Sequence, residues 1–292
     1  MLLTVLALPL GAASFSVEDL RLPGKKGACF TLREPGPRKK GTVAKNMPKV
    51  KALNVAWNYS WGARRKDEQP NELEFVPMIW SGGQEHKLKG RIKEMRSDIA
   101  SGKVKRLLGF NEPDGKKQAN MSVERALKLW TILESAGVPL ASPGAVHADK
   151  EWMLKFMDGV REKGLRVDYI AVHSYGGAAA SRFKKKMRKI YELHNKRPLL
   201  ITEFAVADWK TGGDLSKNRH SAAEVLAFMK EVLPWLEKQD WILGYAWFSF
   251  NDDAPAGHSS ALFDKKGRLT PLGPYYRSVT PDRPEGDQRI GL

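Results

Sequence analysis

The sequence contains a single cysteine, Cys29, among its 292 residues, so no disulfide can form within the chain. Cys29 lies in an apolar run, and we interpret it as a buried core thiol rather than a nucleophile. Long hydrophobic stretches are missing too, because the apolar segment at residues 2–10 is too short to cross a bilayer. We therefore expect no transmembrane segment.

Motifs that hold metals, nucleotides or serine nucleophiles are also absent. None of the six histidines stands in an HExxH or similar metal-binding spacing. The sequence has no GxGxxG, P-loop or GxSxG pattern, and no zinc-finger spacing or RNP-type aromatic motif. These absences predict a protein without metal or cofactor and without a specific nucleic-acid partner.

Acidic residues are few relative to basic ones: 33 against 49, for a net charge of +16. Such a charge favours acidic partners, such as nucleic acid, an anionic wall or a membrane surface. The basic residues fall in expected helices and loops, among them Lys25, Lys26 and the run at 184–189. We interpret them as solvated outer faces with nonspecific electrostatic effects.

The two ends of the chain differ from its middle. Residues 1–13 resemble a signal peptide without a basic n-region, and we expect a secreted or cell-wall-associated protein. Alternatives are a misassigned start or a segment that packs on the domain. Residues 24–279 are expected to form one catalytic domain, and residues 280–292 a solvated tail. We expect a monomer.

Short apolar runs alternate with helical patterns along the chain. Stripes of apolar residues at helical spacing mark five helices, and Ser122 and Gly137 are the expected caps of the helix at 123–135. Repeated strand–helix alternation predicts an α/β fold, a compact (β/α)8 TIM barrel. The expected strands are Gly27–Leu32, Asn54–Trp61, Glu74–Trp80, Val104–Phe110, Pro139–Ser142, Val167–His173, Leu199–Phe204 and Ile242–Phe248.

Two of these strands end in a carboxylate, Glu112 within GFNEPD and Glu203 within ITEF. The carboxyl ends of barrel strands are where chemistry is done. Two carboxyl groups about 5–5.5 Å apart suit a retaining glycosidase, in which one protonates the leaving oxygen and the other attacks the sugar. Asn111 could bind a sugar 2-hydroxyl. The alternative is that each glutamate is a salt-bridge partner at the rim.

Aromatic residues gather at the same strand ends. Flat rings suit the apolar faces of sugars, and Trp57, Trp61, Trp80 and Trp247 are the favoured platforms. His173 alternates with Tyr175 and could bind a hydroxyl or a carboxylate, or be a buried core histidine. The candidate substrate-binding residues are Asn111, Trp57, Tyr59, Trp61, Trp80, His173, Tyr175, Trp209, Trp247 and Phe250.

Several segments together resemble glycoside hydrolase family 128. They are WNYSWG (57–62), FVPMIW (75–80), GFNEPD (109–114), NMSVERALKLW (120–130), LASPGA (140–145), DYIAVHSYG (168–176), ITEFA (201–205), YAWF (245–248) and LTPLGPYY (269–276). The resemblance implies a (β/α)8 barrel with retaining endo-β-1,3-glucanase activity on a β-glucan partner. By matching motif, Glu112 corresponds to the acid/base and Glu203 to the nucleophile. The weakly matching first strand and the basic charge depart from this pattern.

Two other functions stay open at this stage. One is a β-1,3-glucan-binding protein of cell-wall organisation with weak or no catalysis, which new reducing ends from laminarin would distinguish from an enzyme. The other is a binder of acidic polymers, whose affinity would depend steeply on salt.

Overall fold

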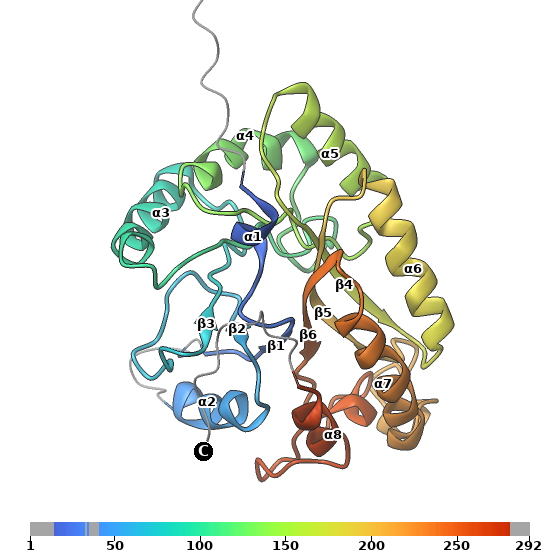
Figure 1. The fold of residues 1–292 in the computed structure, drawn as a ribbon. Helices are drawn as coiled ribbons and strands as arrows, with labels where there is room; N and C mark the ends of the chain where they lie inside the picture. The colour runs from blue at the N-terminus through green and yellow to red at the C-terminus, as the bar shows by residue number, and fades with distance from the viewer. Residues whose placement is uncertain (1–14, 33, 35–40, 281–292) are drawn as a thin grey trace, which may run out of the picture.

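A computed structural model describes residues 15–280 except for residue 33 and residues 35–40. The strands are β1 (Lys26–Cys29), β2 (Trp57–Tyr59), β3 (Glu74–Phe75), β4 (Ile170–Gly176), β5 (Leu199–Val206) and β6 (Ile242–Phe248). The α-helices are α1 (Val17–Leu20), α2 (Thr42–Ala52), α3 (Glu85–Ala100), α4 (Val123–Glu134), α5 (Glu151–Glu162), α6 (Ala180–Leu193), α7 (Ala222–Glu237) and α8 (Leu272–Ser278). Figure 1 shows α2 to α8 arranged around the strands.

The sheet is parallel, with strand order β3-β2-β1-β6-β5-β4. The expected strands at 104–110 and 139–142 appear only as isolated parallel bridges. These bridges pair Met78 with Leu108, Leu107 with Leu140, and Ala141 with Tyr169. They connect the segment after β3 to β4, so the eight expected strand segments form a closed ring. The α/β barrel prediction is confirmed.

Prolines explain why this side of the barrel has bridges rather than regular ladders. Pro77, Pro139 and Pro143 have no N–H to donate, so the ladder is interrupted at each of them. Their carbonyls still accept: Leu108 N donates to Pro77 O, and Leu107 N to Pro139 O, both at 2.9 Å. The ring is therefore closed by short hydrogen-bonded contacts.

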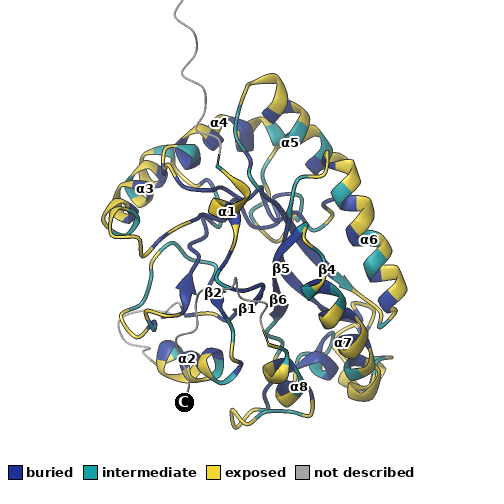
Figure 2. Cartoon of the chain, in the orientation of Figure 1, coloured by how far each residue is buried: buried dark blue, intermediate teal, exposed yellow. Residues whose placement is uncertain are grey.

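The five expected helices are all present, and the predicted caps lie where the sequence placed them. Ser122 Oγ accepts a hydrogen bond from Arg125 N at 3.2 Å at the start of α4. Gly137 and Gly164, just beyond α4 and α5, have φ of 72° and 63°, a region that glycine adopts readily. Figure 2 shows buried strands within a ring of helices whose outer faces are exposed.

The core has an inner and an outer part. Cys29, Trp57 and Tyr59 belong to a cluster inside the barrel, whereas Trp130 and Trp247 belong to the cluster between strands and helices. Cys29 is fully buried, as expected, and its thiol donates to Trp247 O at 3.3 Å. Burial raises the pKa of this thiol well above its ordinary value, which fits a core residue.

Lys25 and Lys26 correct the expectation that they are solvated. Both are buried, and both bind the last carbonyls of a helix. Lys25 Nζ donates to Glu237 O and Gln239 O, and Lys26 Nζ to Tyr276 O at 2.9 Å. The carbonyl ends of α7 and α8 carry partial negative charge, which compensates these cations. These partners lie more than 200 residues away along the chain, so local sequence patterns do not predict them.

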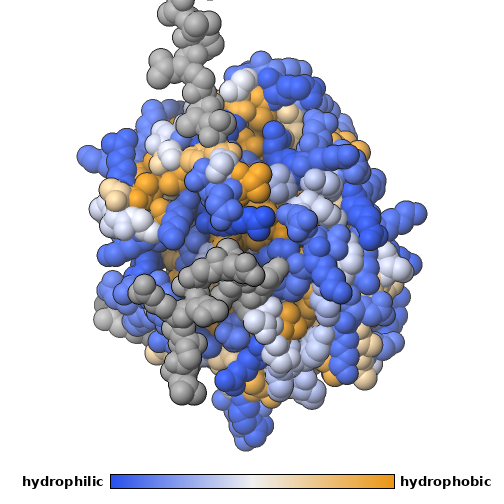
Figure 3. Space-filling view, viewed as in Figure 1, coloured by the Kyte–Doolittle hydropathy of each residue, from blue (hydrophilic) through white to orange (hydrophobic). Residues whose placement is uncertain are grey.

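Other basic residues, such as Lys89, Lys155 and Lys189, are exposed as expected. Figure 3 shows hydrophilic residues over most of one face, including the outer side of α6 at the right edge. Of the predicted end segments, residues 1–13 and 281–292 lie outside the described residues, so export stays a prediction. Within the part of the chain that is described, no helix is both long and apolar enough to cross a bilayer.

Candidate active site

Glu112 and Glu203 meet at the carboxyl end of the barrel. Glu203 lies on β5, and Glu112 follows the bridge between Asn111 and Gly144. One oxygen of each carboxylate and one nitrogen of His173 all lie within 4.8 Å of one another. Neither glutamate contacts a lysine or arginine among the described residues. The rim salt-bridge alternative is therefore wrong, and the predicted convergence of the two acids is confirmed.

Glu112 has a strained backbone. Its φ is +44°, a left-handed conformation that is rare for a residue with a side chain and rarer still before a proline. Its N–H donates to Gly144 O at 2.7 Å, and its carbonyl accepts from Gly115 N at 2.9 Å. The neighbouring Asp114 accepts from Val146 N at 2.8 Å. These bonds hold the conformation and direct the Glu112 side chain toward the cleft, as is common for strain at functional sites.

Three hydrogen-bond donors surround the carboxylate of Glu203. Trp61 Nε1 lies 2.7 Å and Tyr59 Oη 3.1 Å from Oε1, and Tyr175 Oη lies 2.5 Å from Oε2. Burial, and then the charge of Glu203, raise the pKa of both tyrosines well above the ordinary value, so both remain protonated donors. This arrangement replaces water around a negative charge on Glu203.

His173 links the two acids. It pairs in register with Glu203 across β4 and β5, and its Nδ1 lies 2.9 Å from Glu112 Oε1 and 3.5 Å from Glu203 Oε2. Burial by itself lowers the pKa of His173, but the charges of Glu203 and Glu112 outweigh it, so the pKa is raised. Nε2 has no hydrogen-bond partner among the described residues and faces Gly144.

The acids lie in a cleft of about 680 Å³. Of the predicted substrate-binding residues, five line it together with the two acids: Asn111, Trp61, Trp80, Tyr175 and Trp209. Trp209 is 63% exposed at the rim and packs edge-on against Tyr175. Volume and lining are typical of a ligand site.

Two predicted platforms, Trp57 and Trp247, are wrong. Both are buried, with 0% and 1% exposure. Trp57 faces the barrel interior like Tyr59, but it lies deeper along the strand, and its Nε1 donates to Lys25 O at 3.0 Å. Trp247 points outward to the helices and donates to Ser260 O at 2.8 Å. Neither ring can reach a sugar.

Tyr59 and Phe250 lie near the cleft without lining it. Tyr59 is buried and reaches the site only through its hydroxyl, so it positions Glu203 rather than stacking on a sugar. Phe250 packs behind the wall, with its ring centroid 6.0 Å from that of Tyr175. His173 is likewise buried and acts through the acids rather than on a sugar hydroxyl.

Sequence reasoning missed several lining residues. Phe248, the last residue of β6 and of the YAWF segment, also lines the cleft. Gln118, Val146, His147 and Lys186 come from loops and a helix, where no strand-end signal marks them. Burial beside the cleft lowers the pKa of Lys186.

Glu112, His173 and Glu203 are also the one group of three potential metal ligands found among the described residues. The donors around Glu203 occupy both of its oxygens, which suits a carboxylate held for chemistry with carbon rather than a metal ligand.

This geometry is that of a glycosidase, and comparisons agree. The chain belongs to the family described as the glycosyl hydrolase catalytic core, which matches residues 29–276. The solved structures that it resembles at 28% and 26% identity are members of glycoside hydrolase family 128, which supports the resemblance to that family.

One such structure is a subgroup I endo-β-1,3-glucanase from Amycolatopsis mediterranei in complex with laminaritriose. It is 28% identical, with a TM-score of 0.71 over 88% of this chain and 99% of that one. A subgroup II endo-β-1,3-glucanase from Sorangium cellulosum is 26% identical, with a TM-score of 0.66 over 87% and 98%. A subgroup V exo-β-1,3-glucanase from Cryptococcus neoformans, 24% identical with a TM-score of 0.66 over 89% and 100%, shares the fold. The comparison with curated proteins gives no match.

Proposed function

We propose that this protein is a retaining glycosidase that cleaves internal bonds of β-1,3-glucans. The observation that supports it most is the spacing of Glu112 and Glu203, because one oxygen of each carboxylate lies within 4.8 Å of the other. Retaining enzymes hold their carboxyl groups about 5–5.5 Å apart, whereas inverting enzymes need about 6.5–9.5 Å to admit a water. The family members that bind laminarioligosaccharides support the choice of glucan.

The roles of the two acids follow from their surroundings. In the first step, an ionised oxygen of Glu203 attacks the anomeric carbon while the carboxylic acid of Glu112 gives its proton to the glycosidic oxygen. The glycosidic bond breaks and a glycosyl ester forms on Glu203. In the second step, Glu112 takes a proton from water as the water oxygen attacks the same carbon, and Glu203 leaves as a carboxylate. The three donors around Glu203 suit the nucleophile, because they solvate its charge before and after each step.

The remaining cleft residues would hold the sugar chain. Trp61 and Trp80 on one side and Trp209 at the rim offer ring faces and edges to pyranose rings. Asn111 Oδ1 has no partner among the described residues, so it can accept a hydrogen bond from a sugar 2-hydroxyl. That bond strengthens as the oxocarbenium-like transition state forms.

Incubation with laminarin tests the proposal. We expect new reducing ends, a mixture of oligosaccharides from early internal cuts, and first-formed products with the β configuration in proton NMR. Initial products of α configuration would refute the retaining course. A protein that binds laminarin but releases no reducing ends would be the glucan-binding alternative.

The Glu203→Gln variant tests the role of the nucleophile. It keeps the shape of the side chain but removes its charge, so we expect turnover to fall by about 10⁴-fold or more while laminarihexaose binding remains measurable. Glu151→Gln is the matched control, because it makes the same substitution at an exposed glutamate of α5, outside the cleft. Substantial residual turnover by Glu203→Gln would contradict the assignment.

A further inference from the structure

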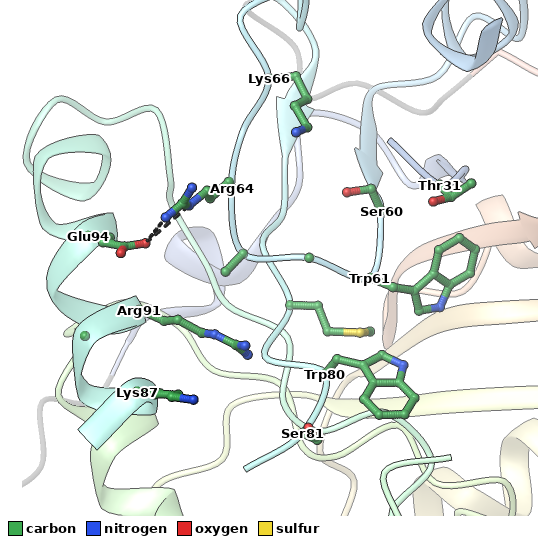
Figure 4. Close-up of a pocket in the computed structure, with 14 residues that line it drawn as sticks. Thr31, Ser60, Trp61, Arg64, Lys66, Trp80, Ser81, Lys87, Arg91 and Glu94 are labelled. Carbon is green, nitrogen blue, oxygen red and sulfur yellow. Dashed lines mark hydrogen bonds and ion pairs between the residues drawn. The ribbon is translucent and has the colours of Figure 1, made fainter. Parts of the chain in front are cut away.

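A second hollow adjoins the catalytic cleft. Its volume is about 960 Å³, and it shares Trp61 and Trp80 with the cleft, so the two form one continuous groove. It lies between the loop after β2 and the N-terminal half of α3 (Figure 4). A sugar chain that passes the tryptophan pair therefore enters this hollow.

The walls of the hollow are basic. They carry Arg64, Lys66, Lys87 and Arg91, and a single acid, Glu94. Arg64 Nη2 lies 2.9 Å from Glu94 Oε2, so those two charges cancel. The other three cations have no acidic partner within salt-bridge distance among the described residues. The groove extension therefore carries three uncompensated positive charges.

Helix α3 determines where two of these charges lie. Lys87 and Arg91 are one turn apart on α3, so their side chains leave the same face. Figure 4 shows both extending from α3 toward the side on which Trp80 and Ser81 lie. Lys66 reaches the hollow from the loop opposite. The cations thus face the path of a bound chain rather than the outer solvent alone.

A neutral glucan carries no negative charge to pair with these three cations. We propose that this hollow binds an anionic substituent, a carboxylate or a phosphate, carried by the sugar chain beyond the cleaved bond. The inference rests on the proposed function, since it concerns the same groove. It also gives part of the +16 net charge a specific role.

Binding of matched ligands to the Glu203→Gln variant, which prevents turnover, tests the inference. The ligands are laminarihexaose, its carboxymethylated form and its phosphorylated form, and the signal is tryptophan fluorescence. The test variant adds K87Q and R91Q. The control adds K93Q and R96Q, which remove one lysine and one arginine from the same helix but do not line the hollow.

We expect the parent to bind the anionic hexasaccharides roughly tenfold more tightly than the neutral one, the size of two partly screened ion pairs. K87Q/R91Q should lose most of that preference, and K93Q/R96Q should keep it. Raising the salt from about 0.05 M to about 0.5 M should abolish it. If only the phosphorylated ligand binds more tightly than the neutral one, the hollow is specific for phosphate. If both anionic ligands gain equally, the hollow accepts either a carboxylate or a phosphate.

Two outcomes in the double variants would overturn the inference, and so would the absence of any preference in the parent. In one, the preference survives in K87Q/R91Q; in the other, both double variants lose it equally. The first would show that Lys87 and Arg91 do not bind the anion, and the second would assign the effect to the overall charge of the chain. The neutral hexasaccharide separates this failure from that of the proposed function. If it binds normally but substituents add nothing, only the anion site is refuted. If laminarin is neither bound nor cleaved by the wild-type protein, the glucanase proposal fails.

Discussion

Gly144 offers a sharp test of the active-site geometry, because it lies against His173 and leaves no room for a side chain. A Cβ atom on Gly144 would lie 2.6 Å from His173 Nε2, whereas ordinary contacts begin at 3.4 Å. The ring is fully buried and its Nδ1 is bonded to Glu112, so it cannot rotate freely away. Gly144→Ala must therefore displace His173 or the backbone by about 0.8 Å, if the contact is to become ordinary.

That displacement sets the expected loss. A shift of about 1 Å in a catalytic arrangement can cost about 10²-fold in rate, or about 2.7 kcal/mol of transition-state stabilisation. Overpacking of this kind lowers the free energy of unfolding by about 1–3 kcal/mol. We therefore expect Gly144→Ala to fold, to melt a few degrees lower, and to lose about 100-fold in kcat/KM.

The assay is kcat/KM on laminarin at a temperature well below the melting point, with unfolding followed by circular dichroism. Gly176→Ala is the matched control, because a Cβ there meets nothing within 4 Å, and we expect activity close to wild type. His173→Gln breaks the same bond to Glu112 without overpacking and should lose activity to a similar degree. A Gly144→Ala variant with kcat/KM within about twofold of wild type would show that the rate does not depend on the position of His173, and the role given to His173 would be wrong.

Three further predictions follow from the same site. Tyr175→Phe removes the 2.5 Å donor to Glu203. A hydrogen bond to a charged group is worth about 1.5–3 kcal/mol, so we expect kcat to fall about 10- to 150-fold if that bond is needed in the transition state. An unchanged kcat would contradict this. Trp209→Ala should raise KM for laminarin and change the free energy of unfolding by no more than about 0.5 kcal/mol, because Trp209 is exposed. Trp247→Ala should lower the free energy of unfolding by about 3–5 kcal/mol, because Trp247 is buried. Equal effects of the two variants on stability would refute these placements. Folding raises the pKa of His173, so the protonated ring stabilises the folded protein. This contribution to the free energy of unfolding is complete below the unfolded pKa of about 6.5 and is lost as the pH rises through the folded pKa. Chemical denaturation from about pH 6 to 9 should show this loss in the wild type and not in His173→Gln; identical profiles would exclude it.

Periodicity and strand ends were enough to predict the barrel and its acids. A carboxylate at the end of a buried parallel strand lies at one known edge of the sheet, so Glu112 and Glu203 could be brought together without coordinates. The hydroxyl of Tyr175 and the indole of Trp61 followed the same rule and do reach the site.

The sequence predicts which edge of the sheet a residue lies at better than it predicts how deep the side chain lies in the barrel or whether it points inward or toward the helices. Trp57 shares its face with Tyr59 but lies deeper in the barrel, and Trp247 faces the helices, so equal residue types at neighbouring positions have different surroundings. The basic run at 184–189 predicts solvated lysines, but Lys186 is partly buried. Its burial depends on how α6 packs against the barrel. Periodicity alone carries neither kind of information.

The contacts of Lys26 have a consequence for how the protein is made. Its ammonium group donates hydrogen bonds to the carbonyls of Tyr276, Arg277 and Val279, so β1 is bound to the C-terminal end of α8. A ribosome releases the first strand long before that helix exists. Until then, the ammonium lacks those three acceptors, and a buried cation without its partners is costly. We therefore expect the junction of β1 and β6 to become stable only once synthesis has passed the end of α8, and a nascent chain halted earlier to be protease-sensitive.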